Sequence, residues 1–122
     1  MNGALIVTWG GNVPGREAKS LEVFGRALAH FDELAKNGRI HGHKEYLALT
    51  GNVEELAGIM VVEGPVEELS KLQTEEATRT LLIEGASIAK HFTATLTAGG
   101  DEQTLTKEIT LFTKTQQGLG YL

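Results

Sequence analysis

The amino-acid sequence predicts one α+β domain over residues 1–122, with a four-stranded antiparallel sheet, two crossover helices and an extra C-terminal helix. Two observations predict this fold class. The hydrophobic patterns follow the order β-α-β-β-α-β and then a further helix, which is the split β-α-β arrangement. The first and third strand patterns are continuously apolar while the second and fourth alternate, as central and edge strands of such a sheet require.

The first two elements are a strand and a long helix. Residues 4–9 form a short apolar run, rich in β-branched side chains, that ends at a Gly-Gly pair. Such a run is typical of a strand covered on both faces. Apolar residues then recur at helical spacing over 16–37, and Asn37-Gly38 is a helix stop signal.

Two strands and a long helical segment are expected next. The run at about 40–50 alternates charged and apolar residues, whereas the run at 57–63 is solidly apolar. Gly64-Pro65 ends that strand and opens a helical region over 66–90, because proline is tolerated in a first helical turn. The helical phase shifts near Thr74, which we expect to cap a second helical segment.

The C-terminal part is expected to add the last strand and a final helix. Residues 92–97 alternate cleanly, which indicates a strand with one face on the core. Asp101 is a candidate N-cap. The amphipathic helix that follows is marked by Leu105, Ile109 and Phe112, and residues 116–122 are expected to be irregular.

Composition excludes several classes of partner and site. The net charge is −5, and 11 basic residues are scattered among 16 acidic ones, which excludes nucleic acid and an anionic membrane surface as main partners. No apolar stretch approaches the roughly 20 residues of a transmembrane helix, and the N-terminus lacks the basic region of a signal peptide. We therefore expect a cytoplasmic protein. The absence of cysteine fits this and excludes disulfides and thiol chemistry.

The predicted sheet has more apolar surface than two crossover helices can shield. Helices in a split β-α-β domain cover one face, yet the central strands are apolar on both faces. A second copy of the chain, a ligand or the extra C-terminal helix would have to cover the other face.

The topology, the chain length, the Trp9-Gly10 loop into the helix and the appended helix resemble the dimeric α+β barrel superfamily, whose subunits have a ferredoxin-like fold. The resemblance covers the whole chain and is architectural. It implies a homodimer in which two sheets close a barrel that often holds a small molecule. Members include cofactor-free monooxygenases, lactone isomerases, haem-degrading enzymes and proteins of no known activity. No branch's motif is recognisable, so no catalytic residue is transferred and no cofactor is expected.

The Gly-rich loop over residues 10–17 has the glycine spacing of a phosphate-binding loop. Arg16 stands where that motif needs lysine, and Glu17 stands where it needs a hydroxyl for Mg²⁺. We therefore expect a structural turn. The alternative is that Arg16 helps to bind an anion at the helix start.

Three histidines are the candidate proton-transfer groups. His41 and His43 fall with Glu45 on one face of a predicted strand, a set that suits a divalent metal. The solvated face of an edge strand explains the same pattern, and we favour it, so no metal is expected. His91 begins the opposite edge strand and would meet the others only across a dimer.

Two functional hypotheses follow. The first is a homodimer with a small, mostly apolar pocket between sheet and helices, lined by Trp9 or Tyr46, that binds a small apolar or aromatic molecule. As an enzyme it would be monooxygenase- or isomerase-like, act without a cofactor and use His41, His43 or His91. The alternative is a non-catalytic structural or regulatory module that binds protein through its apolar sheet face.

Overall fold

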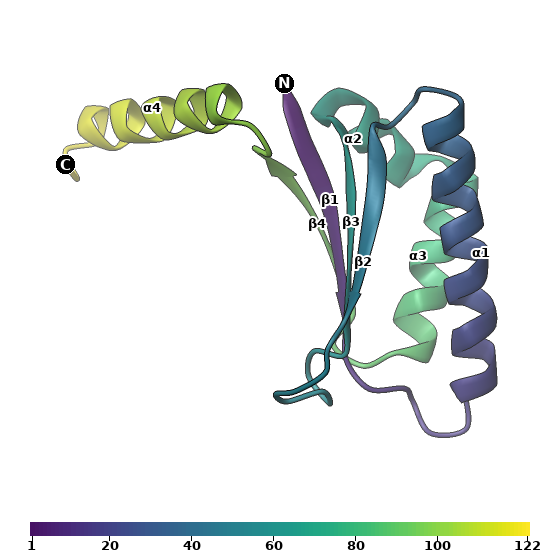
Figure 1. Ribbon diagram of the computed structural model, residues 1–122. Coiled ribbons are helices and arrows are strands. Elements are labelled where there is room, and N and C mark those ends of the chain that lie inside the picture. The colour runs from purple at the N-terminus through teal and green to yellow at the C-terminus, as the bar shows by residue number, and fades with distance from the viewer.

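The computed structural model describes residues 1–122 and contains one antiparallel sheet with three helices on one face and a fourth that leaves the body (Figure 1). The elements are β1 (Asn2–Trp9), α1 (Glu17–Lys36), β2 (Gly42–Leu47), β3 (Gly58–Pro65), α2 (Val66–Thr74), α3 (Glu76–Ile88), β4 (Thr93–Ala98) and α4 (Glu102–Gly118). This order confirms the predicted split β-α-β arrangement with an added C-terminal helix.

The strand order is β2-β3-β1-β4, so the two continuously apolar strands are central, as predicted. β1 pairs antiparallel with β3 and with β4, and β3 also pairs antiparallel with β2. Side chains alternate between the faces of a strand. The register of β1 therefore relates the faces of β1, β3 and β4, and the pairing of β2 with β3 extends this relation to the fourth strand.

The core lies between the sheet and the helices α1, α2 and α3. Leu5 and Val7 of β1 and Met60 and Val62 of β3 are buried toward these helices. The helices and the loop after α1 contribute Phe31, Leu34, Ile40, Leu69 and Leu72 to the same cluster. Burying a side chain of this size stabilises the fold by about 1.5–3 kcal/mol relative to its exposure.

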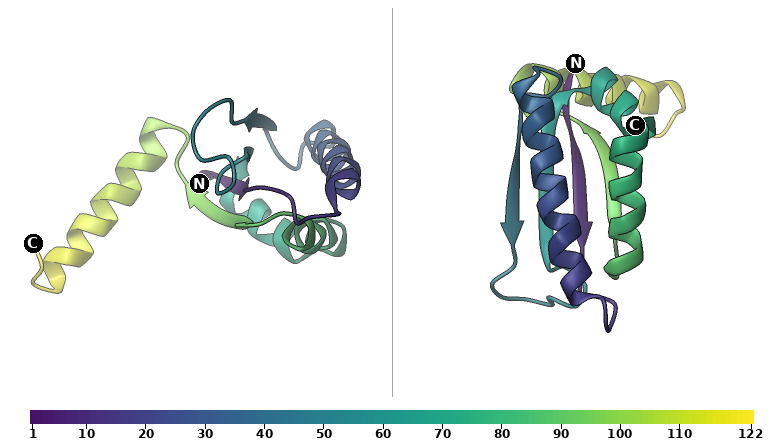
Figure 2. Two further views of the ribbon diagram at one scale, coloured as in Figure 1. Left: turned by 90° about the horizontal axis from the view of Figure 1, so that it is seen from below. Right: turned by 90° about the vertical axis from the view of Figure 1, so that its right-hand side faces the viewer.

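The opposite face of the sheet carries no helix of its own (Figure 2). Ile6, Ile59 and Val61 lie at the alternate positions of the central strands and are only half-buried. Threonines of β4 and the Lys44–Glu63 ion pair border this apolar strip. We call this surface the open face. No helix of the structure combines the length and apolarity needed to cross a membrane.

The break between α2 and α3 differs from the prediction. Thr74 does not cap α3, because its hydroxyl donates to the Lys71 carbonyl within α2. Glu75, in an extended conformation, is the N-cap residue and makes no side-chain cap. Its carboxylate instead accepts two hydrogen bonds from the Arg39 guanidinium at 2.9 and 2.7 Å, and Arg39 also binds Glu68. The break is thus held by an ion-pair network from the loop after α1.

α4 begins as predicted and runs longer than predicted. The Asp101 carboxylate accepts a 2.7 Å hydrogen bond from the Thr104 amide, which confirms the N-cap. The helix continues to Gly118, so residues 116–118 are helical rather than irregular. It extends from the end of β4 away from the sheet, on the side opposite to α1 and α3 (Figures 1 and 2).

Trp9 packs closely against the neighbouring central strand at the end of β1. Its cross-strand partner is Gly58, and a Cβ at that glycine would overlap the indole ring. The indole therefore lies where a neighbouring side chain would otherwise stand. No other residue type fits at position 58 without moving the ring.

We expect Gly58→Ala to lower the free energy of unfolding by about 1–3 kcal/mol, because the added methyl group displaces the indole of Trp9. Urea unfolding followed by fluorescence of the single tryptophan measures this loss. Gly42→Ala is the matched control, since a Cβ at that strand glycine meets nothing within 4 Å. Equal stability of the two variants would contradict the packing described for Trp9.

Candidate functional site

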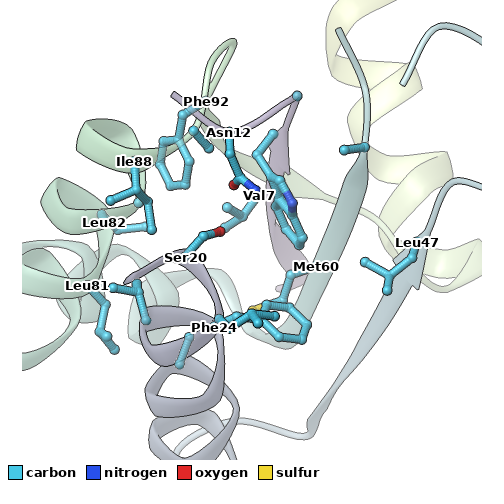
Figure 3. Close-up of a pocket in the computed structure, with 18 of the residues that line it drawn as sticks. Val7, Asn12, Ser20, Phe24, Leu47, Met60, Leu81, Leu82, Ile88 and Phe92 are labelled. Carbon is cyan, nitrogen blue, oxygen red and sulfur yellow. The ribbon is translucent and has the colours of Figure 1, made fainter. Parts of the chain in front are cut away.

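An apolar cavity of about 290 Å³ lies between the sheet and the helices α1 and α3, and it is partly open to solvent (Figure 3). Its floor comes from β1 and β3, and its walls come from α1 and α3. The principal apolar residues around it are Val7, Trp9, Phe24, Met60, Ile88 and Phe92. Val7, Phe31 and Met60 belong both to this lining and to the buried hydrophobic cluster.

Aromatic rings shape the cavity. The rings of Trp9 and Phe24 lie with their centroids 5.7 Å apart and tilted by 58°, which is a favourable aromatic geometry. Gly85 of α3 makes room for the ring of Phe92, because a Cβ there would collide with it. For Trp9 the sequence favoured core or interface packing and offered ligand contact as the alternative, and the structure places it in the cavity lining.

Besides the Trp9 indole, the polar side chains in the cavity lining are those of Asn12 and Ser20. The lining includes no charged residue. Both side chains point into the cavity in Figure 3. The sequence reasoning missed both residues. The available signal was the position of Asn12, three residues after the apolar strand in a loop that must turn back to α1.

The Gly-rich loop is a structural turn in which the amides of Gly10 and Gly11 and the guanidinium of Arg16 are bonded within the chain. The amide of Gly10 donates to the Lys90 carbonyl, and the amide of Gly11 donates to the Glu54 carbonyl. Arg16 donates through its guanidinium to the carbonyl of Ser87 near the end of α3. Arg16 therefore ties α1 to α3 and does not line the cavity.

Tyr46 lies away from the cavity. It is on the open-face side of β2, paired with Ile59, and is 57% exposed. The two aromatic residues that the sequence singled out thus lie on opposite faces of the sheet.

His43 and Glu45 do not lie on a solvated face, so that prediction was wrong for both. The register of β2 pairs them with Val62 and Met60, which turns them toward the helices. His43 is 10% exposed at its side chain and forms hydrogen bonds through Nδ1 to Glu45 and through Nε2 to Asp32 of α1. This triad of His43, Glu45 and Asp32 connects the edge strand to α1.

The two carboxylates that bind the His43 imidazole favour its charged form. Burial lowers the pKa of His43, but hydrogen bonds from both ring nitrogens to carboxylates outweigh it, so the pKa lies above the ordinary value of about 6.5. Both ring nitrogens donate when the ring is an imidazolium. The ring is therefore a bridge between two acidic groups rather than a free base.

The other two histidines lie apart from this triad. His41 precedes β2 and is exposed. His91 is also exposed, lies just before β4 and has a φ of 54°. No group of three or more histidine, aspartate or glutamate side chains is arranged to hold a metal ion.

No protein-family model and no curated protein matches this chain. Solved structures resemble it, and two of them are described here. One is a dimeric protein of unknown function with a ferredoxin-like fold from Bacteroides fragilis NCTC 9343, at 10% identity and a TM-score of 0.58, covering 78% of this chain and 93% of that one. The other is a dimeric ferredoxin-like protein of unknown function from Jannaschia sp. CCS1, at 8% identity and a TM-score of 0.62, covering 79% and 97%. This likeness shows that the fold is ferredoxin-like.

The triad generates a prediction about pH. A histidine whose pKa is raised in the folded state stabilises the fold fully below its unfolded pKa of about 6.5, and loses this contribution as the pH rises through its folded pKa. We therefore expect the excess stability of wild type over His43→Gln to shrink as the pH is raised above about 6.5. Urea unfolding at a series of pH values measures it, with the exposed His41→Gln as control. A difference that does not change with pH would contradict the charged bridge.

Proposed function

We propose that this protein is a homodimer that binds a small apolar or aromatic molecule in the cavity between its sheet and helices. The cavity itself carries this proposal. Its lining is almost wholly apolar and includes the neighbouring, mutually tilted rings of Trp9 and Phe24. Cavities of this kind are the usual sites for small ligands.

The size of the cavity limits its occupant. A cavity of about 150 Å³ is enough to hold benzene, and pockets for drug-sized ligands begin at about 300 Å³. The 290 Å³ found here therefore suits a molecule of one or two rings. Each Å² of apolar surface removed from water contributes about 25 cal/mol to binding before the costs of association.

The lining supports binding rather than proton transfer. None of the residues that surround the cavity is a histidine, a carboxylate or a lysine. His41, His43 and His91 all lie outside it, and His43 is engaged by two carboxylates. General acid–base catalysis needs such a group within hydrogen-bond reach of the substrate. We therefore propose a binding protein in preference to a cofactor-free enzyme.

The open face and α4 support the dimer. The helix carries Leu105, Ile109 and Phe112 at helical spacing, and these side chains are 50%, 55% and 62% exposed. α4 leaves the body on the same side of the sheet as the open face (Figure 1). A second copy seated there would cover both apolar surfaces at once. Both solved structures described above are dimeric, which agrees with this proposal.

We expect sedimentation at micromolar concentration to give twice the 13.1 kDa mass of the chain.

Phe112→Glu should weaken the dimer at least about tenfold, because it buries a charge in the proposed interface. Thr110→Glu is the matched control, since residue 110 lies on the face of α4 that points away from the apolar stripe. A wild-type monomer, or equal effects of the two variants, would contradict the proposed interface.

We expect calorimetry to detect binding of at least one of three probes, namely toluene, p-cresol and indole. Ala27→Phe should weaken that binding at least about tenfold, because residue 27 lines the cavity and the added ring fills it. Ala29→Phe, on the exposed side of the same helix, is the control. Thermal unfolding checks that both variants fold. The proposal fails if no probe binds, or if Ala29→Phe weakens binding as much as Ala27→Phe.

A further inference from the structure

We propose that the ligand is an uncharged aromatic molecule that carries a hydroxyl or carbonyl oxygen, and that Asn12 and Ser20 bind this oxygen. The inference rests on the proposed function, since it concerns the same cavity. It adds the chemical class of the ligand and the two residues that select it.

The two polar side chains come from separate elements and reach the same cavity. Asn12 belongs to the loop after β1, and Ser20 lies on α1. In Figure 3 the Asn12 amide and the Ser20 hydroxyl point toward the same part of the cavity. Neither side chain makes a hydrogen bond within the chain, so both remain available to a ligand.

Both side chains stand on a backbone that the fold holds in place. Asn12 pairs with Ala89 in an isolated antiparallel bridge. On either side of it, the Val13 amide donates to the Ile88 carbonyl at 2.9 Å, and the Gly11 carbonyl accepts from the Lys90 amide at 2.8 Å. The amide of Ser20 donates to the Arg16 carbonyl at 2.9 Å within the first turns of α1. Groups positioned before binding lose less entropy when a ligand arrives.

The chemistry of the lining selects the ligand class. A carboxylate or ammonium group would enter an apolar cavity without a partner of opposite charge, which is costly. A pure hydrocarbon would offer no hydrogen-bond partner to the half-buried Ser20 hydroxyl or to the Asn12 amide, which is exposed to solvent. An oxygen at one end of the ring satisfies both groups, because the amide and the hydroxyl can each donate and accept. Trp9 and Phe24 then pack against the ring.

The test compares p-cresol with toluene, which has the same ring and methyl group but no hydroxyl, by titration calorimetry on the full chain. We expect wild type to bind p-cresol at least about tenfold more tightly than toluene. Asn12→Leu and Ser20→Ala should each reduce this ratio by about threefold or more while toluene affinity falls less than about twofold. Asn52→Leu, in the exposed loop between β2 and β3, is the control and should leave the ratio unchanged.

Three outcomes are informative in different ways. Equal affinities of wild type for p-cresol and toluene would overturn the inference and leave the proposed apolar site intact. A preference for p-cresol that survives both Asn12→Leu and Ser20→Ala would overturn the assignment of these residues. Failure of both probes and of indole to bind would remove the proposed function and this inference together.

Discussion

The antiparallel register of β1 between β3 and β4 is the constraint on which the rest of the structure depends. It turns Leu5, Val7 and Trp9 toward the helices and Ile6 toward the open face. Because side chains alternate strictly, a shift by one residue would exchange these two sets. The same register places Trp9 opposite Gly58, where the absent side chain leaves room for the indole at the edge of the cavity.

The apolar core between the sheet and the helices is packed more tightly at one end than at the other. Toward α2 the core closes around Leu69 and Leu72, which are almost fully buried. Toward the Gly-rich loop, α1 and α3 pack less completely against the strands, and the cavity lies there. The Arg16 contact with Ser87 and the pairing of Asn12 with Ala89 hold that end of α3 beside the loop. The backbone around the cavity is therefore held in place by these contacts, including the part that belongs to the loop after β1.

Sequence patterns predicted the element order, the central and edge strands and the Asp101 cap, because these follow from local periodicity and local hydrogen bonding. They failed where a distant partner decides. Thr74 satisfies the signal for an N-cap, yet the ion pair between Arg39 and Glu75 determines how the helix breaks. His43 lies on a polar edge strand, yet Asp32 of α1 binds it on the helix side of the sheet. Alternation alone does not say which face of an edge strand is turned inward.

The sequence by itself determined the fold class, the acidic and cysteine-free composition and the surplus of apolar strand surface, since each is a property of pattern or count. Only the tertiary structure decided which side of the sheet each apolar element and aromatic residue occupies. It directs α4 away from its own sheet and turns Tyr46 away from the cavity that Trp9 lines. It also brings Asn12 together with Ser20. These arrangements depend on contacts between segments far apart in the chain, and such contacts leave no local periodicity in the sequence.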